Sequence, residues 1–86
     1  MKLKNEFITQ SFGDESLLVP TGAAEFSGIV KGNKTLGAIL ECLKQETSED
    51  DIVLSLKERY DAPEDVIRRD VEKVINELRK IGALDE

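Results

Sequence analysis

Hydrophobic and polar residues alternate in short runs over the first thirty positions, and turn residues separate the runs. The runs are EFITQSF, SLLVP and TGAAEFSGIV, interrupted by Gly13-Asp14 and by Pro20. Alternation with a period of two is typical of strands, and Gly and Pro between such runs favour tight turns. We therefore predict a three-stranded antiparallel meander over about residues 3–30.

Beyond residue 33 the apolar period lengthens to that of an amphipathic helix, and polar interruptions divide this part into three helices over about residues 33–82. Each predicted helix has one apolar face. The residues expected on these faces are Leu36, Ile39, Leu40 and Leu43, then Ile52, Val53, Leu56 and Tyr60, then Ile67, Val71, Val74, Leu78 and Ile81.

Residues at the helix boundaries support this division. Asn33, Ser48 and Asp61 are candidate N-caps, and Asp51 gives Ser48 the spacing of a capping box. Gly82 is suited to end the third helix, and the final ALDE adds a short extended segment. Three helices on one face of a small sheet give an α+β fold, winged-helix-like, as a single domain over residues 1–86.

Composition narrows the classes of partner. The chain of 86 residues has 12 Lys and Arg against 18 Asp and Glu, a formal charge of −6, which disfavours nucleic acid as a ligand. No apolar run is long enough to span a membrane, and the N-terminal residues lack the apolar block of a secretory signal. We expect a cytoplasmic protein with no membrane partner.

The sequence has few residues suited to catalysis or to binding a metal. Cys42 is the single cysteine and falls in an apolar helical pattern, which indicates a core residue, and the chain has no histidine. The usual soft-metal ligand sets and histidine-activated nucleophiles are therefore lacking. We expect that the protein binds no metal and no cofactor, and that it is not an enzyme acting alone.

Three motifs, together with the order of elements, carry a resemblance to a known family. NKT opens the first helix, YDAPEDVIRRDV leads into the third, and LRKIGAL closes it. The matching positions are Asn33 with Thr35, Asp70 with Val71, and Leu78 with Gly82 and Leu84. On these features the whole chain resembles the PqqD family.

The resemblance implies a peptide-binding domain of ribosomally synthesised, post-translationally modified peptide biosynthesis, as in the making of the quinone cofactor PQQ. Such domains hold the leader segment of a precursor peptide and present it to a partner enzyme, commonly a radical S-adenosylmethionine protein. The domain is not itself the catalyst. The leader is expected to add as a strand beside the third strand, in the groove between that strand and the third helix.

The resemblance places the candidate site on that strand and on one flank of the third helix. The strand residues are Ala24, Glu25, Phe26, Ser27, Gly28, Ile29 and Val30. One helix flank has Val66, Asp70, Lys73 and Glu77, and the other has Arg68, Glu72, Ile75 and Arg79. Pattern alone does not choose between the flanks. We favour the first, with Val66, Asp70 and Lys73 as site residues, because Val66 is apolar but off the core face and Asp70 belongs to a matched motif.

Two departures from the family pattern concern the shape of this groove. Gly32 stands where an apolar residue is expected, which predicts a looser junction between the third strand and the first helix. The first strand is also unusually polar, which leaves its pairing less defined. Alternatively, Ala24–Val30 is an ordinary strand without a binding role, with Gly28 marking a bend.

Two other functions remain open on the residues alone. A winged-helix regulator would insert the third helix into DNA, using a basic surface that acidic residues interrupt. Alternatively, the exposed strand edge pairs with a second copy of the chain to form a homodimer.

Overall fold

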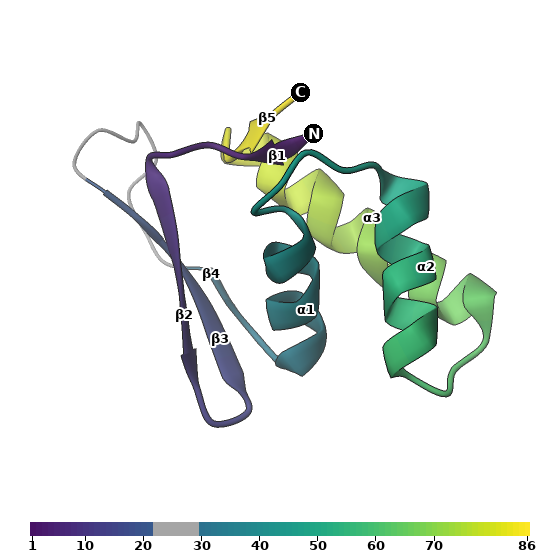
Figure 1. Cartoon of the computed structure of the whole chain (residues 1–86). Coiled ribbons are helices and arrows are strands. Elements are labelled where there is room, and N and C mark those ends of the chain that lie inside the picture. Colours follow the sequence, from purple (N-terminus) through teal and green to yellow (C-terminus); the bar gives the residue numbers. More distant parts are fainter. Residues whose placement is uncertain (22–29) are drawn as a thin grey trace.

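The computed structural model describes residues 1–21 and 30–86. In chain order the strands and helices (Figure 1) are β1 (Lys2–Leu3), β2 (Phe7–Phe12), β3 (Glu15–Pro20), β4 (Val30–Gly32), α1 (Lys34–Cys42), α2 (Glu49–Arg59), α3 (Glu64–Lys80) and β5 (Leu84–Asp85). The predicted α+β class, with a three-stranded antiparallel sheet and three helices, is confirmed.

The main sheet has the strand order β2-β3-β4 with antiparallel pairing throughout. Gly13 and Asp14 form the two-residue loop between β2 and β3, and Gly13 has φ of 60°, which suits the first loop position of a type II′ turn. Beyond the other end of β2, the Thr21 amide donates a 2.7 Å hydrogen bond to the Glu6 carbonyl oxygen. The predicted hairpin and the end of its second strand at Pro20 are confirmed.

The described part of the third strand is β4, which pairs with β3 over the three positions Val30, Lys31 and Gly32. It ends two residues later than the sequence pattern predicted, directly before the Asn33 cap of α1. The predicted strand residues 24–29 lie outside the described residues.

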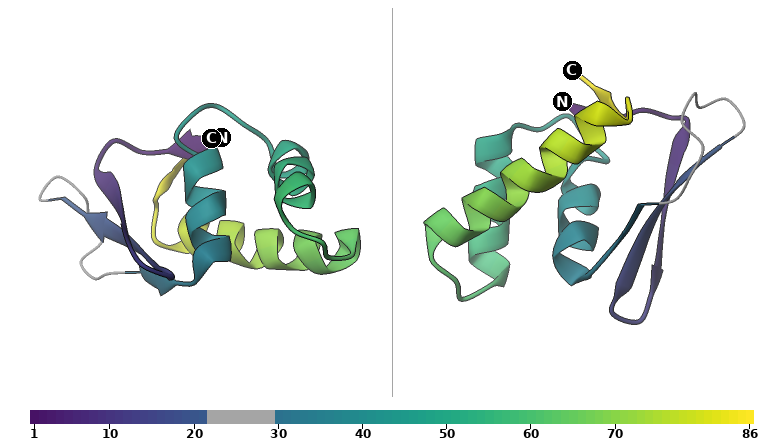
Figure 2. Two further views of the ribbon diagram at one scale, coloured as in Figure 1. Left: turned by 60° about the horizontal axis from the view of Figure 1, so that its bottom comes forward. Right: turned by 180° about the vertical axis from the view of Figure 1, so that it is seen from behind.

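A second, two-stranded ladder was not predicted. β1 pairs with β5 in the register Lys2 with Asp85 and Leu3 with Leu84, so the two ends of the chain lie side by side (Figure 2). The predicted extended segment after the third helix is β5. Its partner was missed because a two-residue strand is too short to show a period.

The helix boundaries follow local capping. Asn33 Oδ1 accepts hydrogen bonds from the amides of Thr35 and Leu36, and Ser48 Oγ accepts one from the amide of Asp51, as predicted. The predicted cap Asp61 is wrong. α3 begins after Pro63, whose extended backbone occupies the N-cap position without any side-chain hydrogen bond.

The C-terminus of α3 is closed by Gly82, as predicted. Gly82 has φ of 70°, and its amide donates to the Arg79 carbonyl oxygen. The Ala83 amide donates to the Leu78 carbonyl oxygen, which completes a Schellman motif and directs the chain into β5. Glycine suits this position because residues with a Cβ avoid positive φ.

The core is centred on α1, which contacts all three strands of the main sheet on one side and α2 and α3 on the other (Figures 1 and 2). Its predicted apolar face is buried, and so is Ala38. On α3 the buried residues are Ile67, Val71, Ile75 and Leu78.

The structure corrects two predictions for α3. Val74 and Ile81 are only partly buried, whereas Ile75, which the sequence pattern assigned to a flank, is fully buried. Both sets fit the period of a helix. Because α3 packs on α2 as well as α1, the buried face is centred on Ile75, and Val74 is turned toward β4.

Candidate functional site

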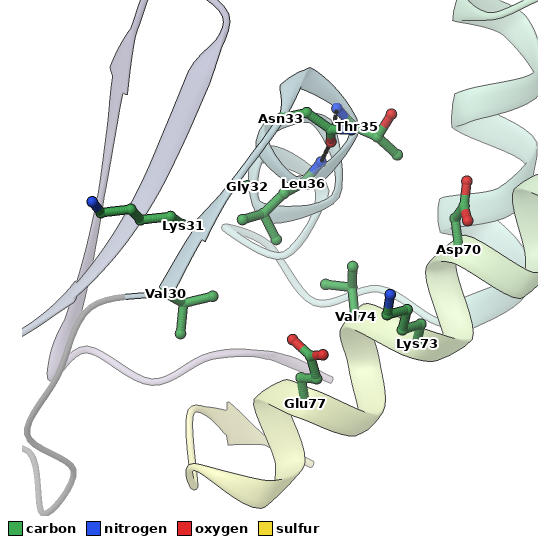
Figure 3. A pocket seen from close by; sticks show the side chains of 10 residues that line it. All are labelled: Val30, Lys31, Gly32, Asn33, Thr35, Leu36, Asp70, Lys73, Val74 and Glu77. Carbon is green, nitrogen blue, oxygen red and sulfur yellow. Dashed lines mark hydrogen bonds between the residues drawn. The ribbon is translucent and has the colours of Figure 1, made fainter.

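A groove of about 240 Å³ lies between β4 with the start of α1 on one side and the middle of α3 on the other (Figure 3). It is lined by Val30, Lys31, Gly32, Asn33, Thr35, Leu36, Asp70, Lys73, Val74 and Glu77. These residues come from two segments about forty positions apart in the sequence, which the packing of α3 on α1 brings together.

The β4 side of the groove is shaped by a close contact between Gly32 and Leu36. A Cβ built on Gly32 would lie 2.7 Å from Leu36 Cβ and closer still to Leu36 Cδ2. Only a residue without a side chain allows Leu36 to fold back over the strand at this distance. The expected looser junction at Gly32 is therefore wrong, because Leu36 fills the space that a side chain on the strand would occupy.

The interior of the groove is apolar and its α3 rim is charged. Val30, Leu36 and Val74 project between β4 and α3, while Asp70, Lys73 and Glu77 follow one edge of the helix (Figure 3). A ligand in this groove would contact both an apolar surface and charges of each sign.

The four charged side chains that line the groove are available to pair with a ligand. In the described part of the chain, none of Lys31, Asp70, Lys73 and Glu77 forms an ion pair. They are all exposed, so they can pair with charges on a ligand without breaking an internal contact. Such exposed pairs contribute more to orientation and choice of ligand than to affinity.

β4 is also an edge of the main sheet. It pairs with β3 on one side, and among the described residues no strand pairs with its other side. In a strand, backbone N–H and C=O groups point alternately to the two neighbouring positions, so an edge strand leaves part of them available. The groove therefore combines an open backbone edge with an apolar interior.

The structure brings together only part of the predicted site. Val30, Asp70 and Lys73 line the groove, so the chosen flank of α3 is the one that borders β4. Val66 is 42% exposed and does not line the groove. Residues 24–29 lie outside the described residues.

Several lining residues were not among the predicted site residues. They are Lys31, Gly32, Asn33, Thr35, Leu36, Val74 and Glu77. Glu77 was already on the chosen flank, and its spacing from Asp70 and Lys73 gave a usable signal. Val74 was assigned to the core, and only the packing direction of α3 distinguishes these two roles.

Two other basic residues of α3, Arg68 and Arg79, form ion pairs within the chain. Arg68 Nη1 lies 2.8 Å from Asp50 Oδ1, and the hydrogen bond between them raises the pKa of Arg68. Arg79 donates to both carboxylate oxygens of Glu86, which raises the pKa of Arg79 and lowers the pKa of Glu86. These pairs reduce the basic surface that the DNA-binding alternative requires.

Among residues 1–21 and 30–86, no three Cys, Asp or Glu side chains lie together in a group that could hold a metal ion. Over residues 1–21 and 30–86, no helix is long and apolar enough to cross a membrane.

Comparison with known proteins gave one family and two similar structures. The first structure, described as TbiB1 in complex with the TbiA(beta) leader peptide, has a TM-score of 0.74 and 17% identity, covering 99% of this chain and 100% of that one. The second, a lasso peptide synthetase B1 complexed with the leader peptide, has a TM-score of 0.73 and 18% identity, covering 95% and 93%. Both share the fold.

No curated protein matches the sequence significantly. The family profile of Coenzyme PQQ synthesis protein D (PqqD) matches residues 16–84, which include β3, β4, all three helices and the groove. Because this match spans well over half of the chain, the protein belongs to the PqqD family.

Proposed function

We propose that this protein binds the leader segment of a ribosomally made precursor peptide and presents the peptide to a modifying enzyme. The observation that carries the proposal is the groove between the edge strand β4 and α3, with its apolar interior. Membership of the PqqD family supports it, as do the two similar structures, both described as complexes with leader peptides.

The leader would bind as an additional strand. Its backbone pairs with the open edge of β4, extending the order β2-β3-β4 by one strand. Alternate side chains of a strand point to opposite faces, so every second leader residue enters the groove between β4 and α3. One apolar leader residue would contact Val30, Leu36 and Val74, and its neighbours would meet the charged rim.

We assign residues 24–29 and Val66 to the same interface as an extension of this proposal. Val66 would contact a part of the leader beyond the groove. Val66 lies one turn before Asp70 on α3, which makes it the next position along the same flank.

In this proposal the protein is the recognition partner and not the catalyst. The reaction belongs to a peptide-modifying enzyme, which we propose is a radical S-adenosylmethionine protein, as the family suggests. Residues 1–86 would act as a single binding domain in the cytoplasm, where the precursor peptide is made.

The test is an amide NMR titration of the labelled protein with the leader of the precursor peptide encoded nearest to its gene. We expect the largest shifts in Val30–Gly32 and along Asp70, Lys73 and Glu77 of α3, with equal shifts from leader and full precursor. The control is a peptide of the same composition in scrambled order. Equal shifts from both peptides, or shifts confined to other surfaces, would contradict the proposal.

A further inference from the structure

The sheet has a second edge, β2, on the side away from the groove. The Thr21 amide donates to the Glu6 carbonyl oxygen, so the backbone groups of Glu6 point toward β3. Since these groups alternate along a strand, those of Thr9 and Ser11 point away from β3. In the described part of the chain, β2 pairs with β3 alone.

The composition of this edge is unusual for an exposed strand. The six residues FITQSF contain no charge, no proline and no glycine, although 35% of all residues in the chain are charged. Natural edge strands commonly contain charged residues or proline, which prevent pairing with other chains. Ile8 and Phe12 are 51% and 63% exposed on the sheet face away from Phe7 and the core.

The strand is also complementary to a copy of itself. When two β2 strands run antiparallel with Gln10 opposite Gln10 of the copy, Ile8 lies opposite Phe12 and Thr9 lies opposite Ser11. Thr9 and Ser11 have outward backbone groups, so their two pairs form four main-chain hydrogen bonds. The facing side chains are then an aromatic with a β-branched residue and two hydroxyl residues, which are favourable cross-strand pairs.

We propose that two copies of this protein associate through β2 in this register, about a two-fold axis that passes between the two Gln10 residues. The occupant is a second copy because the uncharged residues of β2 face one another and every outward backbone group of Thr9 and Ser11 finds a partner. Just beyond β2, Glu6 lies opposite Asp14 of the copy, and this like-charge contact at each end weakens the dimer. The product is a continuous sheet of six strands, β4-β3-β2 and its symmetry mate. Both β4 edges, and therefore both grooves, stay at the outer ends.

The contact is small, so the dimer is weak. Interfaces below about 1,200 Å² are typical of transient complexes, and we expect dissociation constants of about 0.05 to 0.5 mM. The first measurement is sedimentation equilibrium from about 0.01 to 1 mM in buffer of about 0.15 M salt, where the net charge of −6 is screened. A weight-average mass that rises toward twice 9.6 kDa is expected.

The register is tested by placing charges on the two-fold axis. Gln10→Lys and Gln10→Glu each bring like charges together and should weaken the dimer about tenfold. An equimolar mixture of the two variants should regain association at least as strong as that of the unmodified chain. Gln45→Lys, the same change at an exposed position between α1 and α2, should leave it unaltered.

Two results would overturn the proposal. One is a purely monomeric unmodified protein at 1 mM, which would leave β2 available to a different protein. The other is a dimer whose strength does not respond to Gln10→Lys. Circular dichroism of each variant confirms folding. Because the groove lies at the other edge of the sheet, failure of this test leaves leader binding unaffected.

Discussion

Gly37 of α1 lies directly against Ser16 of β3, and Ser16 Oγ occupies the space that a side chain at position 37 would need. A Cβ on Gly37 would also approach Ser16 Cβ to 3.3 Å. Ser16 is almost fully buried, so it has little room to move. This pair therefore sets how closely the central helix approaches the sheet.

Gly37→Ala should lower the free energy of unfolding by about 1 kcal/mol, because overpacking outweighs the gain in helix propensity. In a Ser16→Ala background the same substitution should be neutral or stabilising, since the colliding Oγ is gone. Urea unfolding of the four proteins in this cycle measures the coupling. Equal effects of Gly37→Ala in both backgrounds would show that the contact does not limit the packing.

Gly32→Ala should destabilise the protein by about 1–3 kcal/mol, because its Cβ collides with Leu36. It should also weaken leader binding, since Leu36 is displaced into the groove. Lys31→Ala, on the neighbouring exposed residue, is the control for stability alone, because Lys31 also lines the groove, and its free energy of unfolding should change by no more than about 0.5 kcal/mol. Urea unfolding and peptide titration measure the two effects, and an equal loss of stability in Gly32→Ala and Lys31→Ala would refute the prediction.

Val74→Ala should weaken leader binding about tenfold, because two methyl groups that would contact the leader are worth about 1.5 kcal/mol. Val66→Ala makes the same chemical change one turn before Asp70, at the proposed leader contact beyond the groove, and should weaken binding less than Val74→Ala does, by under about threefold. Isothermal titration calorimetry compares them. A larger effect at Val66 would place the leader on the N-terminal end of α3 instead of in the groove.

Glu64→Gln tests an ion pair that joins α3 to α2. Lys57 Nζ lies 2.9 Å from Glu64 Oε1, and this hydrogen bond lowers the pKa of Glu64. A lowered carboxyl pKa stabilises the folded state above the unfolded value of 4.5, and the contribution is lost as pH falls through the folded pKa. The stability difference between Glu64→Gln and the unmodified protein should therefore shrink below pH 4.5.

The control for this prediction is Asp65→Asn, which removes another carboxylate from the first turn of α3. In the described part of the chain Asp65 forms no ion pair, so its substitution reports the helix-end contribution alone. Thermal unfolding between about pH 3 and 7 compares the two variants. The same pH dependence for both would assign the effect to the helix end instead of Lys57.

The hairpin, the three helices and most caps were predictable because each depends on residues close in sequence. Gly13 with Asp14 defines a turn, and Asn33 and Ser48 define helix starts. The N-cap of α3 was placed wrongly at Asp61, because a good capping side chain two residues earlier gave a stronger local signal than Pro63.

The site was only partly predictable because it depends on which way α3 faces. Ile75 and Val74 are adjacent and both apolar, and the helix period accepts either as a core residue. Because α3 packs against α2 as well as α1, Ile75 is the buried residue and Val74 faces the groove. The role of Gly32 was unpredictable for a similar reason, since the sequence does not show that Leu36 folds over it.

Because β1 pairs with β5, a circular permutant can be made in which a linker joins the present two ends of the chain. Since Lys2 faces Asp85, a short linker would join the two ends without stretching, and new ends at the exposed Gly13-Asp14 turn would leave every helix continuous. In such a circular permutant β2 and β3 no longer share a covalent loop. The sheet would then depend on its hydrogen bonds and on α1, while both sheet edges would stay away from the linker.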